Sequence, residues 1–240
     1  MGELTVISFD MTHGLGTDGT IAVERVAHLV AEAGADLAGL QEIDRFWPRS
    51  YFENQAAVLG RLLGMHHLFA PITPLGGPGR GLAILSRHPV LHHTWHRTAE
   101  GPPCFVLQRA AIGCAGARVT CLNTNPGNSP AVWRKIQGIC RDLHTPALLT
   151  GGAAAEGFAE VMRAIGWRPA VPDEEPVRRP LRDARPQGAV FFSPHWRMQR
   201  VRLFRPAWAV TRPLAATAAL ASPAGATPKP GAFPAAGPRP

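Results

Sequence analysis

Short apolar runs alternate with amphipathic stretches along most of the chain. The apolar runs are rich in β-branched residues and predict buried strands at 4–9, 36–43, 81–86, 104–112, 118–124, 147–150 and 188–193. Apolar positions at helical spacing predict helices from Thr20 to Gly34, over 53–63, from Pro130 to about 143 and over 156–165. The segment 196–204 alternates and predicts a half-exposed strand. This mixed order of strands and helices favours a layered α/β or α+β sandwich.

The pattern changes near the C-terminus. From about Ala215 the sequence consists mainly of Ala, Pro, Gly and Thr and holds few large apolar side chains. Such a composition does not offset the entropy lost on ordering the chain. We therefore expect one domain over 1–216 and a disordered tail over 217–240.

The charge balance is basic, with 25 Lys and Arg against 17 Asp and Glu and a formal net charge of +8. This balance is compatible with anionic partners such as nucleic acid or nucleotides, and equally with arginine used for solubility. The C-terminal third concentrates arginines and aromatic residues. They predict either a surface for single-stranded nucleic acid or solvated strand faces and loops; they are Arg178, Arg179, Arg182, Arg185, Arg197, Arg200, Arg202 and Arg205, with Trp196, Phe204 and Trp208.

Cysteine and histidine usage gives little sign of a metal centre. Cys104, Cys114, Cys121 and Cys140 form no CxxC pair, and no histidine stands at zinc-finger spacing from them. They are expected to be small, buried, reduced thiols. Four histidines at 88, 92, 93 and 96 leave two interpretations open. His92 and His96 could share one face of a strand as metal ligands, or all four could be exposed strand and turn residues.

The N-terminus, Met1-Gly2-Glu3, lacks the basic region of a signal peptide, and no apolar stretch is long enough to cross a bilayer. A cytoplasmic location is expected.

Several motifs occur in a characteristic order: ISFDMTHG, GADLAGLQEID, GLAILSRHP, VTCLNTN, LLTGG and GAVFFSP. In this order they resemble the endonuclease/exonuclease/phosphatase superfamily, which includes DNase I-like nucleases and Mg-dependent phosphodiesterases. The resemblance covers about residues 3–216. It implies a four-layer α/β (α+β) sandwich, in which two mixed β-sheets pack face to face between outer helices.

The resemblance also implies a chemistry, the metal-assisted attack of water on a phosphoester. Glu42 matches the family's Mg²⁺-binding Glu. Asp10 stands where the family has Asn, and it remains an oxygen ligand. These two residues are the expected remnant of a Mg²⁺ site.

The other positions that the resemblance assigns to the reaction carry different residues. Asn125 replaces a His, Gly152 and Ala154 replace the Asp and Asn of a GDFN loop, Gly188 replaces an Asp, and Val210 and Thr211 replace the Asp and His of the closing motif. Arg80 replaces a common aromatic residue. Loss of each such group typically costs about 10²- to 10⁴-fold in rate. The pattern predicts a non-catalytic member that binds an anionic phosphate-containing ligand or a protein partner.

Two alternatives stay open. One is a divergent, active Mg-dependent phosphodiesterase or nuclease, with Glu42 and Asp10 on the metal and His13 or Asp44 as an unusual base. The other is a gene copy that is losing its function, which predicts marginal stability and no stabilising ligand.

Overall fold

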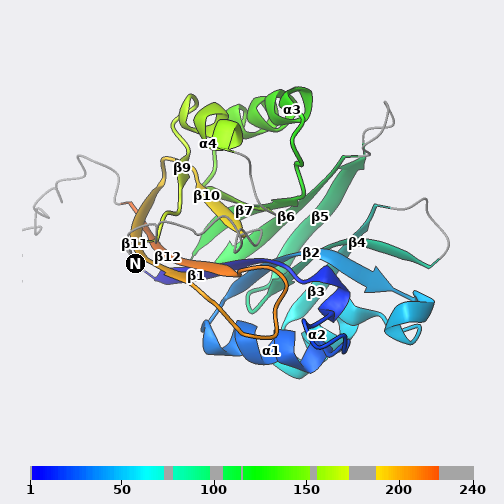
Figure 1. The fold of residues 1–240 in the computed structure, drawn as a ribbon. Helices are drawn as coiled ribbons and strands as arrows, with labels where there is room; N and C mark the ends of the chain where they lie inside the picture. The colour runs from blue at the N-terminus through cyan, green and yellow to red at the C-terminus, as the bar shows by residue number, and fades with distance from the viewer. Residues whose placement is uncertain are drawn as a thin grey trace, which may run out of the picture.

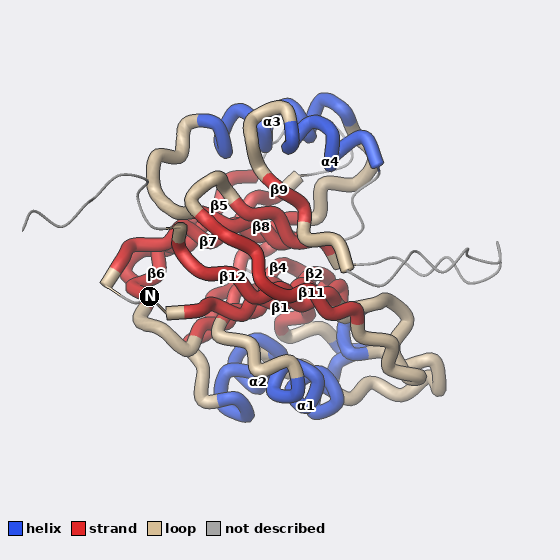
Figure 2. Tube along the Cα trace, turned by 90° about the vertical axis from the view of Figure 1, so that its left-hand side faces the viewer, coloured by secondary structure: helices blue, strands red, loops and turns tan. Residues whose placement is uncertain are grey.

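A computed structural model describes residues 2–72, 78–97, 105–114, 116–151, 156–172 and 188–221. These residues form two six-stranded sheets that pack face to face, with helices on the two outer faces (Figure 1, Figure 2). The arrangement confirms the predicted four-layer sandwich.

The first sheet has the order β11-β12-β1-β2-β4-β3 and contains both the first and the last strand of the described chain. β1 and β2 are parallel, and the other neighbours pair antiparallel. The strands are β1 (Glu3–Asp10), β2 (Leu37–Arg45), β3 (His66–Pro71), β4 (Gly79–Ser86), β11 (Trp196–Leu203) and β12 (Leu214–Leu220).

The second sheet has the order β5-β6-β7-β8-β10-β9, and β7 and β8 are its parallel pair. Its strands are β5 (Val90–Arg97), β6 (Val106–Cys114), β7 (Ala117–Thr124), β8 (Ala147–Gly151), β9 (Arg168–Pro169) and β10 (Ala189–Phe192). Each sheet therefore holds one parallel pair, and a parallel pair brings two carboxyl ends of strands to the same edge.

Four α-helices cover the outer faces: α1 (Val23–Glu32) and α2 (Gln55–Leu63) on the first sheet, and α3 (Pro130–Arg141) and α4 (Glu156–Arg163) on the second (Figure 1). Two short 3₁₀ turns, η1 (Thr12–Gly14) and η2 (Pro48–Ser50), follow β1 and β2. α2 begins where the Asn54 side chain accepts a hydrogen bond from the Ala57 amide, and it ends at Gly64 in the left-handed conformation. Among the described helices, none is long and apolar enough to cross a membrane.

The start of α1 differs from the expectation. The helix begins at Val23 after Ala22, and Thr20 caps nothing. Ile21 instead forms an isolated bridge with Leu15, and the Thr20 carbonyl accepts a hydrogen bond from the Gly16 amide. These backbone contacts close the loop before the helix starts.

The end of the domain also differs. β12 runs from Leu214 to Leu220, past the boundary expected at residue 216, and it lies between β1 and β11. Ala216 and Ala218 are buried between the two sheets, although a composition of Ala and Thr resembles a tail. Small side chains are sufficient to fill the core at β12, because neighbouring strands contribute the larger apolar side chains. Residues 222–240 lie outside the described part of the chain.

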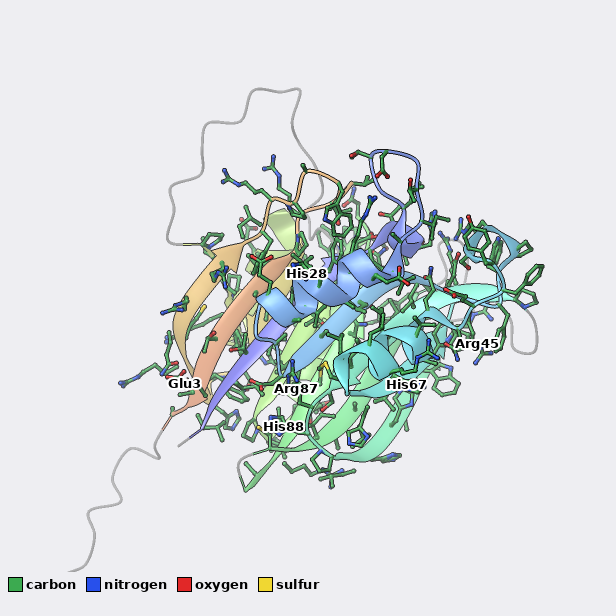
Figure 3. All side chains as sticks on the ribbon, turned by 90° about the horizontal axis from the view of Figure 1, so that it is seen from below. Glu3, His28, Arg45, His67, Arg87 and His88 are labelled. Atoms are coloured by element: carbon green, nitrogen blue, oxygen red, sulfur yellow. The ribbon has the colours of Figure 1, made fainter. Side chains whose placement is uncertain are left out.

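Three of the four cysteines behave as expected. Cys114, Cys121 and Cys140 are buried free thiols, and burial raises the pKa of Cys121 and of Cys140 to about 12. Cys104 lies outside the described residues. The turn Arg87-His88-Pro89 follows β4, with Arg87 and His88 beside each other (Figure 3). The Arg87 Nε atom donates a hydrogen bond to the Ala35 carbonyl at 2.9 Å.

Candidate functional site

The candidate site lies where the two parallel pairs end. Asp10, the last residue of β1, pairs with Gln41 of β2, and Glu42 follows directly. In the second sheet Thr124 of β7 pairs with Gly151 of β8, and Asn125 follows. Ligands of open α/β sheets bind outside the carboxyl ends of such strands. Folding therefore carries the sequence-predicted residues to one edge of the sandwich.

Buried polar side chains join the two sheets beneath this edge. The Asn123 side chain donates to the carbonyls of Leu40 and Ala83 at 3.0 and 2.9 Å, across the interface between the sheets. Its Oδ1 atom accepts hydrogen bonds from the Gln41 amide at 2.8 Å and the Thr150 hydroxyl at 3.1 Å. These contacts fix the two parallel pairs relative to each other, so the residues that follow them have defined positions.

Glu42 sits at an irregularity in β2. The pairing with β4 shifts register between Leu40 and Ile43, and Glu42 adopts a left-handed backbone with φ of 54°. A non-glycine residue in this conformation costs about 1 kcal/mol. Bulges of this kind redirect a side chain, and they are common beside functional sites.

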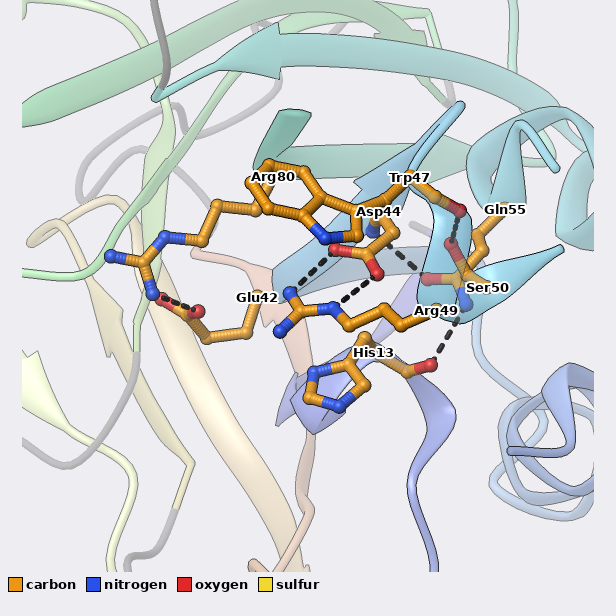
Figure 4. A network of polar contacts seen from close by, with 8 residues as sticks. All are labelled: His13, Glu42, Asp44, Trp47, Arg49, Ser50, Gln55 and Arg80. Atoms are coloured by element: carbon orange, nitrogen blue, oxygen red, sulfur yellow. Dashed lines mark hydrogen bonds and ion pairs between the residues drawn. The ribbon is translucent and has the colours of Figure 1, made fainter. Parts of the chain in front are cut away.

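The Glu42 carboxylate is paired with Arg80 of β4. The Arg80 Nη1 atom lies 2.8 Å from Glu42 Oε2 (Figure 4). The side chains are 49% and 21% exposed, so water partly screens this ion pair. Arg80 thus provides a positive charge at the carboxylate that the sequence resemblance predicts to bind metal.

Asp10 faces this pair from the end of β1. Its Oδ1 atom accepts hydrogen bonds from the Thr12 amide at 3.1 Å and the Thr12 hydroxyl at 3.4 Å. Burial, and then the nearby Glu42 carboxylate, raise the pKa of Asp10 to about 6, although the Thr12 hydrogen bonds and Arg80 oppose the shift. Two carboxyl groups therefore share a poorly solvated space.

A second ion pair lies beside the first. The Asp44 carboxylate has no exposed surface and accepts two hydrogen bonds from Arg49, both at 2.8 Å (Figure 4). Gln55 accepts from the Asp44 amide at 2.9 Å and donates to the His13 carbonyl at 2.8 Å. The hydrogen bonds to Asp44 raise the pKa of Arg49. Both Asp44 oxygens are occupied, so Asp44 is poorly placed to act as a base.

His13 is the other base considered from the sequence. It lies in η1 with a left-handed backbone, at φ of 48°, and its ring faces Arg49 (Figure 4). Burial, and then the positive charge of Arg49, lower the pKa of His13, although Asp44 and Glu42 oppose the shift. The imidazole is therefore neutral near pH 7.

Asn125 lines a small pocket with Glu42 and Arg80. The pocket has a volume of about 180 Å³, and its remaining walls are mostly apolar, including Leu82, Phe105 and Val106. An ion pair and an amide thus meet an apolar wall, which suits a small ligand that has one charged end.

The residues at the closing motif also reach the site. The Thr211 hydroxyl donates a hydrogen bond to the Asp10 carbonyl, and Val210 beside it is 37% exposed. The Gly188 amide donates to the Arg212 carbonyl at 2.8 Å. Gly152 and Ala154 lie outside the described residues. The Gly151 carbonyl before them accepts a hydrogen bond from the Ser8 hydroxyl at 2.8 Å, and the Gly151 amide donates one to the same hydroxyl at 3.1 Å.

Gly188 stands in a space with no room for a side chain. A Cβ atom built on it would lie 2.3 Å from the Ser8 carbonyl oxygen and 3.3 Å from the Leu214 amide nitrogen. Both neighbours are backbone atoms of strands in the first sheet and cannot move aside cheaply. The Asp that the resemblance places here is therefore incompatible with the present backbone.

The sequence alone does not predict that Arg49 and Gln55 lie at the candidate site. Their contacts to Asp44 and His13 depend on how η1, η2 and α2 meet in space, and no motif or periodicity marks them.

The histidines considered as metal ligands, His92 and His96, both lie exposed on β5. Within the described ranges no three His, Cys, Asp or Glu side chains are grouped to hold a metal ion.

The raised pKa of Asp10 gives a test of stability. The folded protein holds this proton more tightly than the unfolded chain, so the ionised carboxylate opposes folding as the pH rises through about 6. We expect Asp10→Asn, measured by urea denaturation in EDTA, to raise the free energy of unfolding by about 1–2 kcal/mol at pH 7.5. The gain should vanish below about pH 4, where both folded and unfolded wild-type chains are protonated.

The matched control is Asp18→Asn. Hydrogen bonds from the Thr20 amide and Arg25 lower the pKa of the exposed Asp18, so its neutralisation should not stabilise the protein. A gain at Asp10 that persists unchanged at low pH would contradict the electrostatic explanation.

A two-sheet sandwich that gathers carboxylates at the ends of its parallel strands defines the DNase I-like class of folds. The chain belongs to the endonuclease/exonuclease/phosphatase family, whose sequence profile matches residues 15–185. No curated protein sequence is significantly similar to it.

Solved structures agree with this assignment. An endonuclease/exonuclease/phosphatase from Bacteroides vulgatus superposes with a TM-score of 0.72 at 16% identity, over 92% of this chain and 100% of the other. The Bacteroides thetaiotaomicron mannosyl-6-phosphatase superposes with a TM-score of 0.65 at 15% identity, over 91% of this chain and 100% of the other. The human Nocturnin catalytic domain with bound sulfate superposes with a TM-score of 0.62 at 16% identity, over 91% of this chain and 94% of the other. At these identities the likeness concerns the fold.

Proposed function

We propose that this chain is a non-catalytic member of its family, whose strand-end site binds an anionic phosphate-containing ligand or a protein partner. The observation that carries the proposal is the ion pair between Arg80 and Glu42. In a working phosphoesterase the corresponding carboxylate offers its charge to a divalent cation. Here a guanidinium already neutralises it, and Arg80 lines the same pocket as Asn125.

A Mg²⁺ ion fits this donor set poorly. Asp10 and Glu42 supply oxygen ligands of the right kind, and Mg²⁺ often binds through one or two carboxylates. However, Arg80 competes for one of them, and within the described residues no third acidic or imidazole side chain is grouped with them closely enough to hold the ion. We therefore derive no reaction step through a metal.

The experiment compares wild type, Arg80→Ala and Glu42→Ala in two measurements. The first is hydrolysis of bis(p-nitrophenyl) phosphate with Mg²⁺ or Mn²⁺, where we expect wild type to be no faster than Glu42→Ala. The second is Mn²⁺ binding followed by electron paramagnetic resonance. Removal of the competing guanidinium in Arg80→Ala should tighten Mn²⁺ binding by about 3- to 10-fold, a modest gain because the pair is half-exposed.

Arg61→Ala is the matched control, because it removes an equal charge from the exposed face of α2. If it tightens Mn²⁺ binding as much as Arg80→Ala does, the effect is one of net charge. Wild-type hydrolysis that is metal-dependent and abolished by Glu42→Ala would overturn the proposal.

A divergent, active phosphodiesterase is the second candidate. The observation in its favour is that His13, with a lowered pKa, lies in the same network as the carboxylates and is available as a neutral base. This candidate requires that His13→Ala lose at least about 10²-fold in hydrolysis rate while the fold stays intact. Equal rates for wild type and His13→Ala would exclude it.

A further inference from the structure

The net charge of the protein is unevenly distributed along the chain. Residues 54–141 hold nine of the 25 Lys and Arg but only one of the 17 Asp and Glu, which is Glu100. This stretch therefore carries a net charge of +8, and the rest of the chain is balanced. Glu100 lies outside the described residues.

This basic stretch builds half of the second sheet and its covering helix. β5, β6, β7 and α3 contain no Asp or Glu at all. A surface formed by these four elements therefore has cationic groups without acidic partners of its own. The first sheet differs, because β1 and β2 carry Glu3, Asp10, Glu42 and Asp44.

A groove runs over the outer face of β5, β6 and β7. Ala110 and Ile112 of β6 pack in the core between the sheets, so Arg109 and Ala111 point to the opposite, outer face. His92 of β5 lies opposite Ala111 in register, and Thr94 lies opposite Arg109. With Arg118 of β7, these side chains line a groove of about 300 Å³.

Four of the five lining residues carry groups that suit an anion. Arg109, Arg118 and His92 are exposed, and Thr94 is half-buried with a hydroxyl group. Ala111 lies between them and is 7% exposed. Its small side chain leaves space for the groove between the longer side chains around it. Arg118 lies opposite Gly113, four residues along β6 from Arg109, so the two arginines stand about 13 Å apart along the sheet. That separation lets them contact different phosphates of one chain.

We propose that this groove, on the outer face of β5-β6-β7, binds the phosphodiester backbone of a single-stranded nucleic acid. The site is separate from the strand-end site, which involves the ends of β1, β2, β7 and β8. Guanidinium groups bind phosphate through paired hydrogen bonds, and contacts of this kind are independent of sequence.

The composition of the groove favours nucleic acid over an acidic protein. Protein interfaces are centred on buried aromatic or aliphatic anchors, and none of the five lining residues is a large apolar side chain. Phosphates of a nucleic acid are instead contacted by cationic and hydroxyl side chains, which Arg109, Arg118 and Thr94 supply here.

The test is fluorescence anisotropy with a labelled oligothymidylate of about 15 nucleotides, within the usual site sizes of such surfaces. The variants are Arg109→Gln/Arg118→Gln and, as a control of equal charge, Arg197→Gln/Arg200→Gln on β11 of the other sheet. All four arginines are exposed, so both variants should fold, and thermal unfolding checks this. The groove variant should bind about 10-fold more weakly or worse at about 0.1 M salt. A plot of the logarithm of the binding constant against the logarithm of the salt concentration should become less steep by about 1.4. This is the change expected when two phosphate contacts on a single strand are lost.

Three results would overturn the proposal: no binding by wild type at about 50 mM salt, equal weakening by both double variants, or an oligoglutamate peptide that competes as well as an unlabelled oligonucleotide. The last result would indicate an acidic protein as the partner. The groove variant Arg109→Gln/Arg118→Gln should bind Mn²⁺ as wild type does, because both arginines lie away from the strand-end site. Failure of the proposed function at the strand ends is therefore distinguishable from failure here.

Discussion

Gly188→Asp is expected to destabilise the fold by about 3–5 kcal/mol without restoring hydrolysis, although an Asp is the residue expected here from the motif resemblance. The reason is steric, since a Cβ atom would lie 2.3 Å from the Ser8 carbonyl oxygen. Relief requires β1 or the chain before β12 to move, and such a shift would disturb the Gly188–Arg212 hydrogen bond. Urea denaturation gives the free energy of unfolding, and hydrolysis of an activated phosphodiester is measured on the same sample.

A pair of alanine variants separates sterics from charge. Gly188→Ala should lose most of the same stability, because the clash arises at Cβ. Gly138→Ala in α3 is the matched control, since no atom lies within 4 Å of its Cβ position. It should be neutral or stabilise by about 0.5–1 kcal/mol, as alanine favours a helix over glycine. A Gly188→Asp protein as stable as wild type would show that the backbone at this site is adaptable.

Arg49→Met is expected to destabilise the protein by about 3 kcal/mol. The Asp44 side chain has no exposed surface, and Arg49 provides both of the hydrogen bonds to its carboxylate. Removal of the guanidinium leaves a buried charge without a partner, and its desolvation is then uncompensated. Chemical denaturation measures the loss, and near-UV circular dichroism verifies that the folded state persists.

The double variant Asp44→Asn/Arg49→Met tests this explanation. A neutral amide in place of the carboxylate should recover at least half of the lost stability, because the unpaired charge is gone. Arg25→Met breaks the exposed pair with Asp18 and serves as the control, for which we expect little change. If the double variant is no more stable than Arg49→Met, the contribution of Arg49 comes from packing and not from its charge.

Much of the fold could be predicted from local patterns. The apolar runs at 4–9, 81–86 and 147–150 became β1, β4 and β8, because a short continuous apolar run is typical of a strand that is covered on both faces. β12 was missed for the opposite reason. Its alanines carry little burial signal of their own, and they are buried only because β1 and β11 flank them.

The candidate site shows the same division. Glu42, Asp10 and Asn125 could be located from the order of motifs, since each follows an apolar run that ends at the same edge of the sandwich. The partner of each charge could not be located in this way. Arg80 reaches Glu42 only because β2 carries an irregularity there, and Arg49 reaches Asp44 only because η2 folds back over β2.

The sequence alone therefore determined the class of fold and the positions of most strands and helices, and it predicts which family positions carry altered residues. The tertiary structure decided which charges neutralise one another, that Gly188 has a backbone oxygen where a side chain would stand, and which face of β5-β6-β7 presents its cations together. The physical reason is range. Burial periodicity is recorded within a few residues along the chain, whereas ion pairs and steric contacts depend on atoms that only folding brings within a few ångströms.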